Sequence, residues 1–254
     1  MFPRFKPRFQ PAPGDIATAL ALLTRIPVRA GFGRTAEATW AFPLAGLAVG
    51  LIAGAIATIA GWLTLGAGLI AGFTLAASII VTGAMHEDGL ADCSDGFWGG
   101  FTRVRRLEIM RDSRIGAYGV LALILSLLLR FTALSMLAHQ DVIVTTVIAS
   151  AMLSRAPLPY LMALMPPARE DGLSVQTGRP PRDAASLGAV VAFVLCWIVV
   201  GFVPTVLAAS AVTATAFVTA RIAKRKIGGQ TGDVLGATQN VAEIMALTVF
   251  ATLA

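Results

Sequence analysis

The chain of 254 residues is poor in charge: Asp, Glu, Lys and Arg together make up 13% of it, against roughly a quarter of an average soluble domain. Hydrophobic residues, in contrast, make up 56%. This composition excludes an ordinary soluble globular protein, and it gives no reason to expect a nucleic-acid partner.

Cysteine is also scarce, with Cys93 in a polar segment and Cys196 inside an apolar run. Two such separated cysteines provide neither a disulfide framework nor a Cys-rich metal site. The N-terminus lacks the continuous apolar segment of a signal peptide, and its prolines oppose a helix. We expect residues 1–13 to be a basic tail that either lies on an anionic membrane surface or is disordered. Its aromatic and basic side chains alternate, as Phe2, Arg4, Phe5, Lys6, Arg8 and Phe9.

Long apolar runs are what the sequence has in abundance, and they raise its mean hydropathy to +0.77. Each run of about 20 residues can cross the hydrocarbon core of a bilayer as a helix. A β-barrel would alternate apolar and polar residues in segments of about 10, whereas these runs are continuously apolar. We therefore predict an all-α, polytopic membrane helix bundle that forms one domain over 1–254. The interfacial segment is 14–41, and the predicted spans are 42–62, 67–85, 116–137, 141–164, 185–203, 205–221 and 237–254.

The distribution of Lys and Arg predicts which way the spans face. Of the 20 basic residues, 18 fall in the N-terminal segment 1–41 and in the polar stretches near 86–115, 165–184 and 221–236. Because Lys and Arg collect on the cytoplasmic side, we expect the N-terminus and the loops 86–115, 165–184 and 222–236 to be cytoplasmic. This count requires seven spans, with a hairpin broken near Pro204.

Two features inside the spans have structural interpretations. Gly46, Gly50 and Gly54 follow one another at i, i+4 spacing, and such a stripe lets a second helix approach closely. Arg130 lies toward the outer end of its span, where its long side chain can snorkel to the interface.

Three carboxylates, Asp88, Asp92 and Asp95, lie at i, i+4 and i+7. If this stretch is helical, they share one face. Carboxylates that close repel one another unless a cation holds them, and Mg²⁺ is the natural one because it binds carboxylates and substrate phosphates together. The alternative is a solvated acidic cap at a helix end. His86 precedes the stripe and is a candidate ligand or catalytic base.

Candidate phosphate-binding residues follow in other polar segments. Arg111 and Arg114 can clamp phosphate oxygens, and Asp112 or Glu108 could complete the metal site. Arg155 lies within a span, and an intramembrane arginine is a candidate site residue.

The last polar segment is rich in glycine and leads directly into the seventh span. A glycine-rich backbone before a helix can cradle phosphate, so Thr231 and Gly232 are candidate phosphate ligands and Asp233 a further metal ligand. A plain glycine-rich turn is the alternative interpretation.

Taken together, these residues resemble the cobalamin synthase family of membrane-bound adenosylcobinamide-GDP ribazoletransferases. The similarity runs in order through most of the chain. Two departures from the family pattern are Glu87, where an apolar residue is expected, and Asn240, where some relatives are acidic. The motifs that carry the resemblance are Leu23-Thr24-Arg25-Ile26-Pro27-Val28, Phe42-Pro43-Leu44-Ala45-Gly46-Leu47, His86-x-Asp88-Gly89-Leu90-x-Asp92-x-x-Asp95-Gly96, Leu107-Glu108-Ile109-Met110-Arg111-Asp112-Ser113-Arg114-Ile115-Gly116, Ser154-Arg155 and Gly228-Gly229-Gln230-Thr231-Gly232-Asp233-Val234-Leu235-Gly236-Ala237.

The resemblance implies a Mg²⁺-dependent enzyme of the bacterial cytoplasmic (inner) membrane. Its substrates would be adenosylcobinamide-GDP and α-ribazole or α-ribazole 5′-phosphate, and GMP would be released. Asp88, Asp92 and Asp95 would hold the metal ion, the arginines would offset phosphate charge, and Asp95 would act as the base. Membrane lipid would surround the protein as a further partner. Whether the protein forms a homo-oligomer is left open by the resemblance.

Three alternatives have sequence features that argue against them. Asp92-x-x-Asp95-Gly96 is half of the CDP-alcohol phosphotransferase signature, but the rest of that signature is missing. Asp88-x-x-x-Asp92 is similar to a prenyltransferase motif, without the second acidic motif. A transporter would place its ionisable residues near the bilayer midplane, whereas here nearly all lie at the ends of the spans.

Overall fold

The structure is a computed structural model that describes residues 9–254, and within them it is a bundle of α-helices. The tail residues 1–8 lie outside the described residues. Long apolar segments become helices because a helix satisfies its own backbone hydrogen bonds where no water can do so. The elements are α1 (Gly14–Leu23), η1 (Glu37–Ala41), α2 (Phe42–Trp62), α3 (Ala67–Thr82), α4 (Met85–Gly99), α5 (Arg103–Ile109), α6 (Ala117–His139), α7 (Ile143–Leu153), α8 (Leu158–Leu164), α9 (Leu173–Thr177), α10 (Arg182–Val200), α11 (Phe202–Ile227) and α12 (Gly232–Leu253).

Six segments are long and apolar enough to cross a membrane as helices, and the pair α3 and α4 passes the same test together. The chain is thus a multi-pass membrane protein with six such helices in its described part, or seven if the bent pair counts as one span. At 16 residues, α3 alone extends about 24 Å, less than the hydrocarbon core. The prediction of an apolar span near 67–85 is accordingly met by a shorter helix with a sharp bend at its end.

The bend between α3 and α4 measures 85°. Gly83 and Ala84 both adopt left-handed backbone conformations, with φ of +64° and +57°. Glycine adopts this conformation at no steric cost, whereas alanine does so with strain. The acidic stretch is helical, as predicted, but it forms a separate helix with its own direction.

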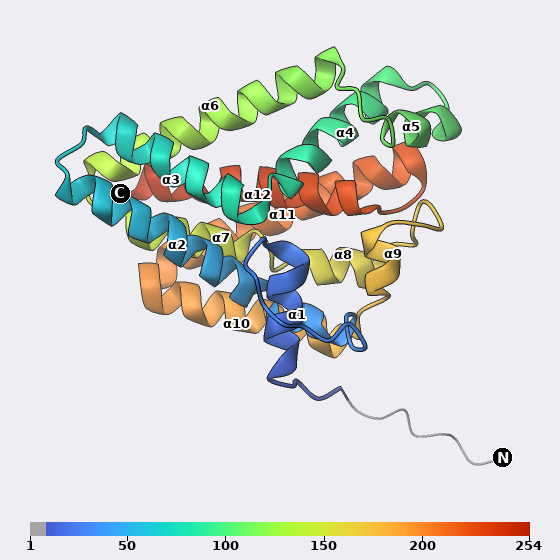
Figure 1. The fold of residues 1–254 in the computed structure, drawn as a ribbon, viewed down its shortest axis with the longest axis horizontal. Helices are drawn as coiled ribbons and strands as arrows, with labels where there is room; N and C mark the ends of the chain where they lie inside the picture. Colours follow the sequence, from blue (N-terminus) through green and yellow to red (C-terminus); the bar gives the residue numbers. More distant parts are fainter. Residues whose placement is uncertain (1–8) are drawn as a thin grey trace.

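Short connections and long polar loops lie at opposite ends of the bundle (Figure 1). The links 63–66 and 140–142 share one end with the C-terminus, and the segments 100–116, 165–172 and 228–231 gather at the other. The predicted break near Pro204 is at Gly201, where φ is +87°, and Pro204 lies in the first turn of α11. Proline is tolerated in the first turn of a helix because the N–H it lacks would have no partner there.

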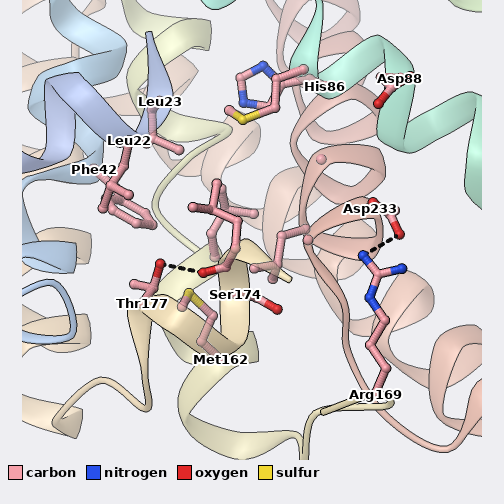
Figure 2. A pocket seen from close by; sticks show the side chains of 16 residues that line it. Leu22, Leu23, Phe42, His86, Asp88, Met162, Arg169, Ser174, Thr177 and Asp233 are labelled. Atoms are coloured by element: carbon pink, nitrogen blue, oxygen red, sulfur yellow. Dashed lines mark hydrogen bonds and ion pairs between the residues drawn. The ribbon is translucent and has the colours of Figure 1, made fainter. Parts of the chain in front are cut away.

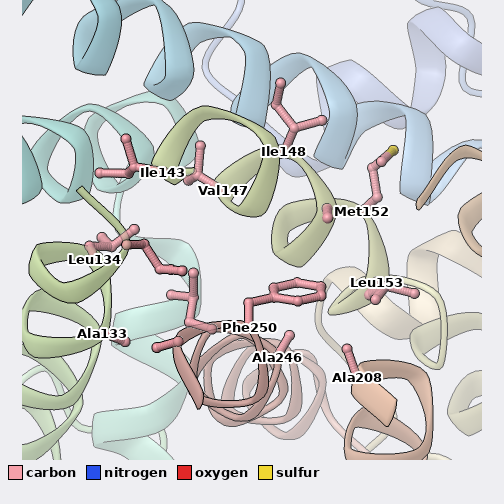
Figure 3. Close-up of a cluster of buried hydrophobic side chains, with 14 of the residues drawn as sticks. Ala133, Leu134, Ile143, Val147, Ile148, Met152, Leu153, Ala208, Ala246 and Phe250 are labelled. Carbon is pink, nitrogen blue, oxygen red and sulfur yellow. The ribbon is translucent and has the colours of Figure 1, made fainter. Parts of the chain in front are cut away.

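The predicted small-residue stripe packs α2 against α7. A Cβ atom added to Gly46 would come 2.2 Å from the carbonyl oxygen of Ala151, and one added to Gly50 would come 2.6 Å from the Cα of Ile148. Farther along, Leu134, Val147 and Phe250 meet in the apolar core between α6, α7 and α12 (Figure 3). Apolar contacts of this kind hold membrane helices together mainly by close packing.

An ion pair is buried among α4, α6 and α12. Arg130 Nη2 donates to Glu87 Oε1 over 2.8 Å, and the Arg130 side chain is 2% exposed. Asn240 Nδ2 donates to the same Glu87 oxygen over 3.3 Å, and Asn240 Oδ1 accepts from Ser126. The prediction that Arg130 snorkels to the interface is therefore wrong, because Glu87 provides it with a buried carboxylate.

The α2–α7 contact generates a prediction about stability. Gly46→Ala should lower the stability of the protein in detergent by about 1–3 kcal/mol, the usual cost of overpacking, because its new methyl group meets backbone that cannot move aside. Thermal unfolding measures this loss. Gly61→Ala, in the same helix with nothing within 4 Å of its added Cβ, is the matched control and should be neutral or slightly stabilising. Equal effects of the two variants would contradict the close contact.

A second prediction concerns the buried ion pair. Glu87→Leu and Arg130→Met should each destabilise the protein by about 3–5 kcal/mol, because each leaves an uncompensated charge. The double variant should lose much less than the sum of these two losses. Unfolding midpoints of the four proteins in one detergent measure the coupling, and simple additivity would show that the pair contributes nothing.

Candidate functional site

A cavity of about 160 Å³ lies at the polar end of the bundle, where α4 and α12 begin. Its apolar side is formed by residues such as Leu23, Phe42 and Met162, from α1, α2 and α8. Figure 2 shows the polar groups on its opposite side: His86, Asp88, Arg169 and Asp233.

Two glycines bring the polar groups of the cavity together. A Cβ atom on Gly89 would lie 2.7 Å from the carbonyl oxygen of Asp233, and one on Gly236 would lie 3.2 Å from the carbonyl oxygen of Met85. The first turns of α4 and α12 therefore touch backbone to backbone. This contact places Asp88 of one helix near Asp233 of the other.

Arg169 balances part of the negative charge of this site. Its Nη2 lies 3.3 Å from Asp233 Oδ2, and both side chains are largely buried, at 14% and 17% exposure. Asp92 is half-buried, one turn beyond Asp88 on the same face of α4, within range of the charges of Asp88, Asp233 and Arg169. The three carboxylates offer the hard oxygen donors that Mg²⁺ prefers. Among residues 9–254, however, no three acidic, His or Cys side chains converge on one point as ligands do.

Asp95 is placed differently from the other two carboxylates of the stripe. Its Oδ2 accepts from the backbone N–H of Gly116 over 2.7 Å, and its Oδ1 accepts from that of Gly119 over 2.9 Å. These N–H groups belong to the first turn of α6, where a carboxylate is stabilised by free donors and by the helix dipole. Both oxygens of Asp95 therefore cap α6, and the predicted roles of metal ligand and base stay predictions.

The loop that holds Arg111, Asp112 and Arg114 lies outside the cavity. Arg114 and Asp112 form an ion pair of 2.7 Å, and the hydrogen bonds from Arg114 lower the pKa of Asp112 to about 2. Arg111 pairs with Asp171 of the neighbouring loop. In this structure Asp112 does not join the carboxylates of the cavity, and both arginines already have acidic partners.

Arg155 lies in the buried interior between α7 and α8. It is 1% exposed, and its Nη1 donates to the carbonyl oxygen of Ala151 over 2.8 Å. His86 is also buried, and its Nε2 has no hydrogen-bond partner in the described part of the chain. Of these two predicted site residues, only His86 lines the cavity.

The glycine-rich segment before α12 serves mainly to build the site. Thr231 is the N-cap of α12, since its hydroxyl accepts from Val234 N over 3.3 Å, and the same hydroxyl donates to Asp233 Oδ2. Gly232 lines the cavity, and a Cβ there would meet nothing within 4 Å. The start of α12 therefore presents open backbone to the cavity, as a phosphate-binding turn would.

Two arginines at the start of the basic loop, Arg103 and Arg106, hold this end of the bundle together. Arg103 Nε donates to the carbonyl oxygen of Ile227 over 2.8 Å, and its Nη2 donates to that of Ala168 over 3.0 Å. Arg106 Nη1 donates to the carbonyl oxygen of Lys226. The last carbonyl groups of a helix lack partners within it and attract cations, so these arginines cap α11 and hold the loops in place.

Two residues of the site region were missed by sequence analysis. Arg169 was counted only as a cytoplasmic charge, although it pairs with Asp233. Arg25 lines a second cavity of about 800 Å³ beside the first. The only sequence signal for Arg25 was its place in the motif Leu23 to Val28, and for Arg169 there was none beyond its charge.

Comparisons with known proteins agree on one family. The family model described as cobalamin-5-phosphate synthase matches residues 15–251. Proteins named adenosylcobinamide-GDP ribazoletransferase from Bradyrhizobium diazoefficiens and Azorhizobium caulinodans are 43% and 44% identical, over 93% and 91% of this chain and 93% and 92% of their own. The Mesorhizobium japonicum protein of the same name is 43% identical over 92% of each chain. No solved structure gives a significant match.

The distinct environments of two aspartates on α4 generate a prediction. Asp95→Asn should lower thermal stability by about 1–3 kcal/mol, because the first turn of α6 loses a charged acceptor. Asp92→Asn, the matched control one turn away, should be neutral or slightly stabilising, because it relieves repulsion from Asp88 and Asp233. Unfolding in detergent without added divalent cations compares the two. A greater loss of thermal stability for Asp92→Asn than for Asp95→Asn would contradict the assignment of Asp95 as the cap of α6.

Proposed function

Because the chain belongs to the cobalamin-5-phosphate synthase family, we propose that it acts as an adenosylcobinamide-GDP ribazoletransferase. It joins α-ribazole or α-ribazole 5′-phosphate to the cobinamide-linked phosphorus of adenosylcobinamide-GDP and releases GMP. This is the attachment of the lower ligand in cobalamin synthesis.

The observation that carries this proposal is the meeting of carboxylates and a guanidinium at one cavity. Asp88, Asp233 and Arg169 all line it, where the close contact of α4 with α12 brings them together. Transfer of a phosphoryl group needs positive groups that offset its charge and an acceptor for the proton of the attacking hydroxyl. Both kinds of group are available at this place.

We assign Mg²⁺ to Asp88, Asp92 and Asp233. The support is the chemistry of the donors: Asp88 and Asp233 line the cavity, and Asp92 lies one turn beyond Asp88 on the same face of α4, within range of both charges. When bound, the ion would neutralise the diphosphate and favour departure of GMP. Asp95 and Asp112 are left out of this ligand set, because the first caps α6 and the second pairs with Arg114.

The residues of the chain divide the remaining work. Arg169 would donate to phosphate oxygens beside Asp233, and the open backbone at Gly232 would add N–H donors at the start of α12. The attacking hydroxyl would pass its proton to Asp88 or Asp92, since both Asp95 oxygens already accept from backbone. His86 also lines the cavity, and because its Nε2 has no hydrogen-bond partner in the described part of the chain, it is a further candidate for the base.

The same proposal includes the location and orientation of the chain. Its loops at the polar end carry most of the basic residues, and such loops stay in the cytoplasm. We therefore place the cavity on the cytoplasmic face of the bacterial inner membrane, where soluble nucleotide substrates arrive. Lipid surrounds the apolar spans, and a homo-oligomer stays compatible with this arrangement.

The proposal predicts the effect of removing single carboxylates on turnover. Asp88→Asn and Asp92→Asn should each lower kcat by about 100-fold or more, because a neutral amide is a poor metal ligand and a poor base. Release of GMP from adenosylcobinamide-GDP in proteoliposomes, followed against Mg²⁺ concentration, measures this. Asp183→Asn is the control, an exposed residue in the first turn of α10, and should stay within about threefold of the parent.

Two outcomes would reject parts of the proposal. Parent protein that releases no GMP without an ion gradient would favour a transporter over a transferase. Active Asp88→Asn and Asp92→Asn proteins with unchanged Mg²⁺ dependence would remove the metal site from these residues.

A further inference from the structure

A second cavity of about 800 Å³ adjoins the first at the polar end of the bundle. It lies between the end of α1, the bend that follows α3, and α9. Its size is within the range of cavities that hold a small ligand. Hydroxyl and amide groups are frequent on its wall, from Thr24, Thr35, Thr82, Gln176 and Thr177.

Arg25 provides the positive charge of this wall, and its backbone is fixed from both sides. Its N–H donates to the carbonyl oxygen of Val81 at the end of α3 over 2.7 Å. The preceding residue, Thr24, ends α1 and donates its hydroxyl to the carbonyl oxygen of Leu20 over 2.7 Å. Gly83 makes room for the side chain, because a Cβ there would meet the Nε of Arg25. The exposed side chain of Arg25 thus passes beside the bend and borders the cavity.

No carboxylate balances Arg25 in the part of the chain that the structure describes. Arg34, Arg111, Arg114, Arg130 and Arg169 each form an ion pair. Arg103 and Arg106 donate to helix-end carbonyl groups. Within residues 9–254, the Arg25 side chain forms no ion pair and no hydrogen bond, although it borders a polar cavity. A guanidinium in that position is suited to a phosphate group.

Asp88 lines both cavities, as do Met85 and Thr177. The two spaces therefore meet at the carboxylate that the proposed function places next to the reacting phosphorus. A substrate in the larger cavity can have one end at Asp88 and the other at Arg25. This arrangement fits a nucleoside monophosphate whose hydroxyl attacks while its phosphate is held apart.

We propose that the larger cavity binds the attacking substrate as its 5′-phosphate, and that Arg25 binds that phosphate. The inference rests on the proposed function and adds the position of the second substrate. A ribose hydroxyl oxygen of this substrate forms a bond to the cobinamide-linked phosphorus, and the bond from that phosphorus to the GMP oxygen breaks. GMP leaves with the electron pair, and the hydroxyl proton goes to the carboxylate at the boundary. The phosphate held by Arg25 takes no part in the exchange.

The test compares two attacking substrates that differ only in this phosphate. In proteoliposomes with saturating adenosylcobinamide-GDP, Arg25→Gln should raise the KM for α-ribazole 5′-phosphate by about 10- to 100-fold, the effect of losing one charge-assisted contact. The KM for α-ribazole and both kcat values should stay within about twofold. Arg25→Lys should recover part of the loss. Arg29→Gln, an exposed arginine four residues away that lines neither cavity, is the matched control.

Binding without turnover provides a second measurement. α-Ribazole 5′-phosphate should raise the melting temperature of the parent and of Arg29→Gln, and should raise that of Arg25→Gln much less at equal concentration. Equal increases in KM for both attacking substrates, an increase only for adenosylcobinamide-GDP, or no increase would each overturn the assignment of Arg25. These outcomes differ from the result expected if the proposed function itself is wrong, because the parent protein would then transfer neither attacking substrate.

Discussion

Gly89 on α4 and Gly236 on α12 let these two helices touch along their backbones, and the candidate site depends on this contact. Any side chain at either position would separate the first turns of the helices. Asp88 and Asp233 would then move apart. The carboxylates repel one another, so apolar packing beneath them must supply the stability that their charges oppose. That packing comes from the deeper half of α12, which lies against α6 and α7 in the apolar core.

Between the apolar core and the cavity lies a layer of buried polar side chains. Glu87, Arg130 and Asn240 form one group of it. Gln239, Glu243 and Ser154 form another, in which Gln239 Nε2 donates to both neighbours. Groups of this kind are costly in a membrane unless they are paired. They fix the rotation of α4, α6 and α12 about their own axes, and so determine which face of α4 looks into the cavity.

Much of the architecture could be predicted from the sequence because the relevant signals are local. The bounds of α2 follow from one continuous apolar run, and the glycine stripe on it predicts a close helix contact. The helical acidic stripe follows from spacing alone. The sequence contains no comparable signal for the bend at Gly83 and Ala84, since alanine rarely adopts a left-handed conformation and so does not predict one. The role of Asp95 and the partner of Arg130 depend on residues 21 and 43 positions away. A single sequence cannot reveal such pairings, and Arg169, which pairs with Asp233, was missed for the same reason. The place of Arg25 beside the second cavity depends on the contact of its backbone with the end of α3.

The position of α12 in the chain has a consequence for biogenesis. The candidate site takes Asp88 from a helix made early in synthesis, but Asp233 and the open turn at Gly232 come from the last helix of the fold. Before α12 is inserted, no helix packs against Gly89, and the polar layer lacks Gln239, Asn240 and Glu243. Every earlier helix can therefore be in the membrane while the site is still incomplete. Insertion of α12 completes both the buried polar layer and the candidate site, so a nascent chain cannot hold Asp88 beside Asp233 before α12 has been made.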